Sequence, residues 1–329
     1  MITSKRNGTV DIFRLLAAFG VICIHVPFNT IAAGNINTVF SPLCVPFFYA
    51  VSLTYFISGL KEDLSIGDVF KKMGYRILLP YLAWTVVYVA LMVLKSRLIG
   101  LQHATGGQFV FWRMLFYGEG AVQLYYLPEL IALQATALSI YLIFYCSYKK
   151  KVIGFVVLTF VVLYYILGSV INAFGVTPLQ CIIFYLAVGF LFSKSTRNTT
   201  TNYYYIIGGV ALTLFALSGI YFNDYFYLFK YTNKLPLCGL GLLLITFGLP
   251  IYTMPKWPFK LCSTSYGVYL SHIVFLEGFA VIIKKLFHIN LYYDFSIKLI
   301  MVSMIFIAAI ILTFLLRKTT LTKRLFLGE

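Results

Sequence analysis

A repeated apolar pattern is the feature of this sequence that most limits its fold. Ten apolar stretches follow one another, and most of them are 17 residues or longer. A helix of about 20 apolar residues crosses the ~30 Å hydrocarbon core of a bilayer. The pattern therefore predicts an all-α, polytopic membrane helical bundle with about ten transmembrane helices. The stretches lie at about 10–31, 41–60, 76–95, 122–146, 152–171, 178–193, 203–222, 235–252, 264–284 and 296–316.

Composition agrees with a membrane protein and excludes other classes. The chain is 61% hydrophobic and only 11% charged, whereas a soluble domain has about 25% charged residues. The net charge of +16 would suggest nucleic acid in a soluble chain. Here the basic residues lie between the apolar stretches, where they orient the helices and contact anionic lipids. We therefore expect membrane lipids and no nucleic acid as partners.

The basic residues also predict the topology. If the amino terminus is cytoplasmic, the inside segments hold 17 lysines and arginines and the outside segments hold 8. The positive-inside rule then places both termini in the cytoplasm. Only about a dozen residues follow the tenth stretch, so we expect one integral membrane domain over residues 1–329 and no soluble domain. The six cysteines are scattered without a CxxC pair, which predicts neither a disulfide framework nor a metal site.

Two ionisable residues interrupt the first apolar stretch. Arg14 and His25 are eleven positions apart, so on a helix they fall within about 20° of one face and about 16 Å apart along the axis. Asp11 shares that face. Ionisable side chains inside a membrane are costly and usually mark function. We interpret this face as one wall of a polar shaft.

Each of these residues also has a structural interpretation. His25 could be a neutral histidine that hydrogen-bonds between helices, or a base that takes a proton from a hydroxyl. Asp11 and Arg14 are spaced for an ion pair at the inner interface. Arg14 could equally present its charge to an anionic ligand. The sequence leaves these alternatives open.

Other candidate residues lie in later stretches. A basic cluster of Lys71, Lys72 and Arg76 precedes the third stretch, where it could serve orientation alone or bind phosphate. Glu129 follows a proline at the outer end of the fourth stretch, and we expect it to line a cavity, because an uncompensated carboxylate there is costly.

The ninth stretch contains a second intramembrane histidine. Its segment STSYGVYLSH holds Tyr269 and His272. Hydrogen bonding between helices would explain both residues. Two spans that each carry a histidine nevertheless favour a shared cavity with His25.

These motifs together resemble the acyltransferase 3 family of integral membrane acyltransferases. VDIFRLLAAFGVICIH resembles its first-helix signature, PFFYAVSLTYF its second-helix element, RILLPYLAW the start of its third helix, LYYLPELIAL its fourth-helix segment and YGVYLSH its late tyrosine, glycine and histidine motif. The matches occur in the family's order over residues 10–272. Two departures are Ser52-Leu53, where the family has serine and glycine, and a basic pair of Lys72 and Arg76, where it often has two arginines.

The resemblance implies transfer of an acyl group, usually acetyl, from cytoplasmic acyl-CoA to a hydroxyl of a cell-surface or lipid-linked glycan in a bacterial plasma membrane. Acyl-CoA is a co-substrate, and no cofactor is permanently bound. A transporter or flippase for glycans or small metabolites is the alternative, and a scaffold without catalysis is a third. The implied catalytic residues are His25, Arg14 and Asp11, the implied donor site is Arg76, Lys72, Lys71 and Ser52, and the implied acceptor site is Glu129, Tyr269 and His272.

Overall fold

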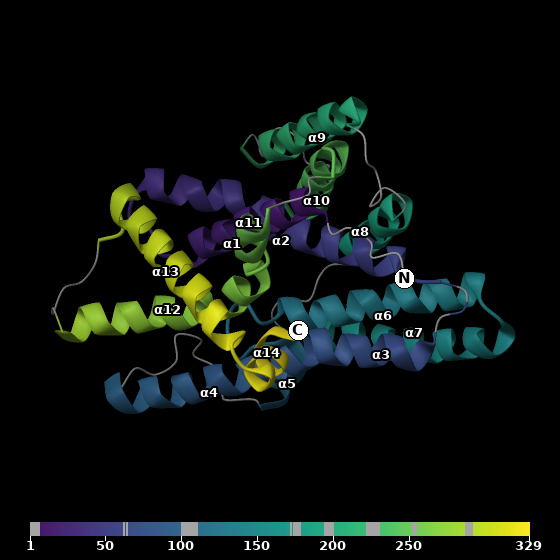
Figure 1. Cartoon of the computed structure of the whole chain (residues 1–329), viewed down its shortest axis with the longest axis horizontal. Helices are drawn as coiled ribbons and strands as arrows, with labels where there is room; N and C mark the ends of the chain where they lie inside the picture. Colours follow the sequence, from purple (N-terminus) through teal and green to yellow (C-terminus); the bar gives the residue numbers. More distant parts are fainter. Residues whose placement is uncertain are drawn as a thin grey trace. The chain divides into compact units, whose positions relative to one another are not determined.

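The protein is all-α, as the apolar pattern predicts. In the computed structural model every regular element among the described residues is a helix, and no strand occurs among them (Figure 1). The structure describes residues 7–61, 63, 65–99, 111–171, 173, 179–193, 201–221, 231–251, 255–286 and 292–329.

Within those residues, seven helical segments are long and apolar enough to cross a membrane. Three shorter apolar helices lie in the remaining predicted stretches. The polytopic class is therefore confirmed, while the total of ten spans stays a prediction. The seven segments are Gly8–His25, Ile31–Ser58, Ile66–Lys95, Tyr126–Tyr145, Tyr148–Val170, Ser265–Ile283 and Phe295–Leu316, and the shorter ones are Cys181–Phe192, Tyr203–Ser218 and Leu237–Gly248.

The helices divide between two compact units. Unit 1 comprises Met1–Gly59 and Pro178–Leu312, and unit 2 comprises Leu60–Thr177 and Thr313–Glu329. Unit 1 contains α1 (Gly8–His25), α2 (Ile31–Ser58), α8 (Leu179–Phe192), α9 (Tyr203–Tyr221), α10 (Tyr231–Gly248), α11 (Lys256–Cys262), α12 (Ser265–Leu286) and most of α13 (Phe295–Leu316). Unit 2 contains α3 (Ile66–Met73), η1 (Gly74–Leu78), α4 (Leu79–Ile99), α5 (Phe111–Tyr117), α6 (Tyr126–Tyr145), α7 (Tyr148–Val170) and α14 (Thr320–Leu327).

Small residues let the helices of unit 1 approach closely. A Cβ atom added to Gly20 on α1 would lie 2.3 Å from Cys44 Sγ on α2, and one added to Gly239 on α10 would lie 2.7 Å from the Pro46 carbonyl oxygen. Such close contacts are how membrane helices associate without a hydrophobic driving force between them. Pro46 in the second stretch therefore lies at a close approach between α2 and α10.

The first apolar stretch ends earlier than the pattern predicts. We expected a helix over 10–31, but α1 ends at His25, and Val26 is extended at φ −69° and ψ 126°. Pro27 explains the break, because the residue before a proline is disfavoured in helical conformation. A new helix then begins at Ile31, capped by the Thr30 hydroxyl, which accepts from the Ala33 amide at 3.3 Å. His25 therefore occupies the last turn of α1, and the expected loop before residue 41 is helical.

In unit 2 the basic cluster lies on a longer helix than expected. The segments α3, η1 and α4 follow one another without a break, and η1 is a π-helical turn. A thirty-residue segment of about 45 Å exceeds the hydrocarbon thickness. The segment is thus long enough to span the core and still carry Lys71 and Lys72 on turns outside it.

Helix α14 packs against α4 in the same unit. The Trp84 indole Nε1 donates a hydrogen bond to the Phe326 carbonyl at 3.0 Å, and their rings meet edge to face at 5.5 Å. Gly328 then turns the chain at φ +63°, where a Cβ atom would lie 2.7 Å from the Arg76 carbonyl oxygen. The backbone beside the basic cluster is thus held by a segment from the other end of the sequence.

Candidate active site

The two intramembrane histidines lie together in unit 1. The rings of His25 on α1 and His272 on α12 have centroids 5.3 Å apart and planes tilted by 32°. His272 is fully buried, and His25 is half-buried. The expectation that the two spans bring their histidines to one place is therefore met, although the sequence spacing between them is nearly 250 residues.

Helix geometry fixes the orientation of His272. Its Nδ1 lies 2.7 Å from the Tyr269 carbonyl oxygen one turn earlier. A carbonyl accepts only, so Nδ1 carries the proton, and a neutral ring then has its lone pair on Nε2. That Nε2 atom is buried and has no hydrogen-bond partner in the part of the chain that the structure describes. The site therefore contains an imidazole nitrogen that can still accept a hydrogen bond.

Aromatic side chains surround the histidine pair. The Tyr269 ring lies 6.0 Å from His272 and 5.8 Å from Phe48 of α2. Tyr269 is 3% exposed, as expected for a residue one turn before His272 on the same face. The sequence-predicted residues Tyr269, His272 and His25 thus form one cluster.

Arg14 and Asp11 lie one turn apart on α1, at the other end of the helix from His25. The Arg14 Nη1 atom is 4.0 Å from Asp11 Oδ1, which confirms the predicted ion pair. The guanidinium carbon also lies 5.6 Å above the centre of the Tyr55 ring of α2, a cation–π contact that the sequence did not predict. Two partners therefore hold the guanidinium in place.

The face of α1 between Arg14 and His25 is packed rather than open. Ala18 and Val21, which share that face, are 0% and 1% exposed, whereas Leu16 on the opposite side is 57% exposed. The polar residues therefore face the protein interior, as predicted. The polar shaft expected between them is wrong for this structure, because small side chains let neighbouring helices close over that face.

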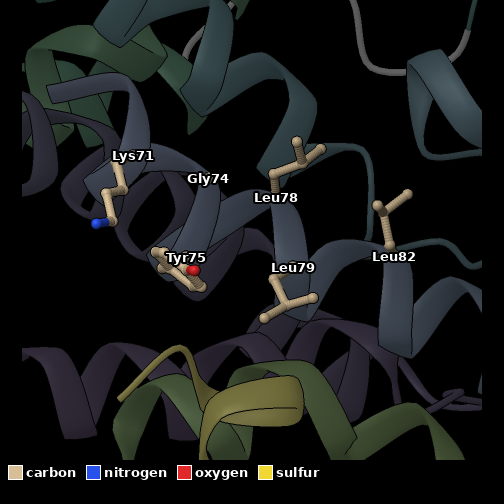
Figure 2. Close-up of a pocket in the computed structure, with 6 residues that line it drawn as sticks. All are labelled: Lys71, Gly74, Tyr75, Leu78, Leu79 and Leu82. Carbon is tan, nitrogen blue, oxygen red and sulfur yellow. The ribbon is translucent and has the colours of Figure 1, made fainter. Parts of the chain in front are cut away.

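The predicted donor residues divide between the units. Ser52 is half-buried on α2 in unit 1, whereas Lys71, Lys72 and Arg76 are exposed on α3 and η1 in unit 2. An apolar pocket of about 300 Å³ lies beside this cluster, and Figure 2 shows the residues that line it. Lys71 stands at one end of the pocket and Leu82 at the other. An anionic group at the lysine and an apolar chain along the leucines would suit this arrangement.

Glu129 does not line an open cavity as expected. It is 1% exposed in α6, and its Oε1 atom accepts a hydrogen bond from the Tyr165 hydroxyl of α7 at 3.0 Å. Burial raises the pKa of Tyr125, which directly precedes α6, and the charge of Glu129 raises it further. The hydroxyl of Tyr165 thus supplies the polar partner for the buried Glu129 carboxylate that we had expected a cavity to supply. An acid and a tyrosine 36 positions apart carry no local signal of pairing.

The fold and the clusters together define a helical membrane protein with a buried histidine pair and an exposed basic cluster. A family model described as an acyltransferase domain matches residues 7–318, nearly the whole chain. The chain therefore belongs to the acyltransferase 3 family and is a membrane acyltransferase. No curated protein and no solved structure matches it.

Proposed function

We propose that this protein transfers an acyl group, most simply acetyl, from cytoplasmic acyl-CoA to a hydroxyl of a cell-surface or lipid-linked glycan. The observation that carries this proposal is the 5.3 Å pairing of His25 with His272 in the interior of unit 1. Ionisable groups are expensive inside a membrane protein and are found there for function. Imidazole is also the side chain best suited to move a proton near neutral pH.

In this mechanism His25 is the general base. Its neutral ring takes the proton of the acceptor hydroxyl while the hydroxyl oxygen forms a bond to the thioester carbonyl carbon. The carbon–sulfur bond then breaks, CoA leaves as a thiolate, and the proton held by His25 returns to the sulfur. A route through an acylated His25 uses the same residue and the same proton balance.

The donor would be held by the cationic residues. Arg14, oriented by Asp11 and Tyr55, offers a planar guanidinium to the donor, with Ser52 on the neighbouring helix. Lys72 and Arg76, together with Lys71, offer exposed positive charge to the phosphates of CoA. These assignments are consistent with the positive-inside count, which favours a cytoplasmic location for the basic cluster.

The acceptor would be bound around the histidine pair. His272 borders His25, Tyr269 borders His272, and the two residues would either contact the acceptor or orient the base. Glu129 is retained as an acceptor candidate, although its buried hydrogen bond to Tyr165 favours a structural role. We place the protein in a bacterial plasma membrane with both termini in the cytoplasm, which reporter fusions at each terminus would test.

The His25→Ala variant tests the proposed base. Purified protein in proteoliposomes is given acetyl-CoA and membrane glycan, and both free thiol and acylated glycan are measured. General-base catalysis contributes about 10²–10⁴-fold, so the variant should lose that factor in turnover. The matched control is Lys149→Ala on the exposed start of α7. Transfer by His25→Ala at the wild-type rate would overturn the proposal.

A further inference from the structure

Unit 1 contains a buried lysine that the proposed mechanism does not use. Lys298, in the first turn of α13, is 0% exposed. Its ammonium donates a hydrogen bond to Asn37 Oδ1 of α2, and it forms no ion pair with any carboxylate among the described residues. A neutral amide oxygen satisfies one of its three donors. A buried charge normally has an opposite charge beside it.

The surroundings of Lys298 increase the need for an anion. Lys298 lies at the amino-terminal end of α13, where the helix dipole is already positive. Asp294, which directly precedes α13, caps that helix and accepts from the Ile297 amide at 2.8 Å. Its carboxylate is therefore turned to the helix backbone. A ligand with negative charge would relieve both the ammonium and the helix end.

Lys298 is connected to a residue on each side of His25 in the sequence, through Asn37 to Ile24 and directly to the Phe28 ring. Asn37, its hydrogen-bond partner, donates from Nδ2 to the carbonyl oxygen of Ile24 at 3.0 Å. On the other side, the Phe28 ring centre lies 5.2 Å from the ammonium. The ammonium therefore lies beside the end of α1 that carries the proposed base.

Phe28 also supplies a route to the ammonium. The Phe28 side chain is 51% exposed, although the lysine beneath it is fully buried. Exposed side chains change rotamer within nanoseconds. Rotation of this ring would expose more of the ammonium to a ligand at the loss of a cation–π contact of about 1 kcal/mol.

We propose that Lys298 binds an anionic group of the acceptor, a phosphate or a carboxylate, and so selects acidic acceptors. This proposal rests on the proposed function, since it takes the acceptor to bind at His25. The same chemistry fits the phosphate of a lipid-linked glycan and the carboxylate of an acidic sugar. Lys298 would hold that group next to Asn37 and present a neighbouring hydroxyl to the base.

Thermal unfolding of the purified full chain tests this binding without any turnover. Decyl phosphate and decanol form one pair of probes, and glucuronate and glucose form the other. We expect one anionic probe to raise the midpoint by a few degrees more than its neutral partner, because a ligand that binds only the folded state stabilises it. The responding pair identifies the phosphate or the carboxylate source.

Three variants locate the effect. Lys298→Met should abolish the difference between the anionic and neutral probes, Lys298→Arg should keep it, and Lys260→Met, an exposed lysine of the same unit, should leave it unchanged. An equal response of wild type and Lys298→Met to every probe would overturn the proposal, even if Lys298→Met folds normally. If Lys298→Met is too unstable to purify, Phe28→Ala replaces it and should strengthen the response by uncovering the ammonium.

The result is separable from the proposed acyl transfer. Anion binding that depends on Lys298, together with unchanged turnover in His25→Ala, would remove the base and leave the anion site. Loss of turnover in His25→Ala, together with no response of the wild type to the anionic probes, would support the base and remove the anion site.

Discussion

In unit 1 two ionisable side chains near the proposed base lie inside the helix packing, whereas in unit 2 the basic cluster lies outside it. His272 and Lys298 are fully buried in unit 1. Lys71, Lys72 and Arg76 are exposed in unit 2. Electrostatic interactions are stronger and less screened by salt in a buried site than on a surface. Substitutions of the buried histidines in unit 1 should therefore change the rate of the chemical step, and substitutions of the unit 2 cluster should change donor affinity and its dependence on salt.

After His25→Ala, the largest effect should come from His272→Ala. Removing this ring leaves a cavity beside His25, so the base loses the group that it packs against. A displacement of about 1 Å in a catalytic group can cost about 100-fold. We expect kcat to fall by about that factor while the KM for acetyl-CoA stays within about twofold. Initial rates over a range of acetyl-CoA concentrations separate the two constants.

A rise in KM with unchanged kcat in His272→Ala would contradict the orienting role, because it would give His272 a part in donor binding instead. Restored kcat in His272→Asn would support the orienting role, since an asparagine side chain can still offer a hydrogen-bonding group to its surroundings.

Arg76→Ala should have a smaller effect, and it should change KM and not kcat. Losing one hydrogen bond to a charged group costs about 1.5–3 kcal/mol, and exposure reduces it, so we expect the KM for acetyl-CoA to rise about tenfold with kcat unchanged. The wild-type KM should also rise with salt, and this dependence should weaken in the variant. Lys149→Ala, which removes an exposed charge elsewhere in unit 2, is the control. A salt dependence identical to wild type would separate Arg76 from donor binding.

The features of unit 1 differ in how well the sequence predicts them. The pairing of Asp11 with Arg14 follows from local helix geometry, and the structure has it at 4.0 Å. The meeting of His25 with His272 could be anticipated only from the rarity of histidines in spans. The end of α1 at His25 was missed because hydropathy continues through a proline that stops the helix.

Contacts between distant polar residues were beyond prediction. Lys298 and Asn37 are 261 positions apart, and each looked ordinary in its own segment. The lysine was counted only as an outside charge, and Asn37 fell in a segment expected to be a loop. A lysine in the first turn of an otherwise apolar span is the one signal that could have drawn attention to it.

The smallest expected effect concerns the buried acid of unit 2. In Tyr165→Phe the carboxyl of Glu129 loses the hydroxyl that donates to it at 3.0 Å. A buried acceptor left without a donor costs about 1–3 kcal/mol. We expect the free energy of unfolding in detergent to fall by about 1–2 kcal/mol, with kcat unchanged. Tyr164→Phe is the matched control, because that hydroxyl makes no hydrogen bond to a described residue. If Tyr165→Phe instead kept full stability and raised the KM for the acceptor, Glu129 would belong to the acceptor site. Unit 2 would then bind the acceptor as well as the donor, and the contrast between the two units would not hold for Glu129.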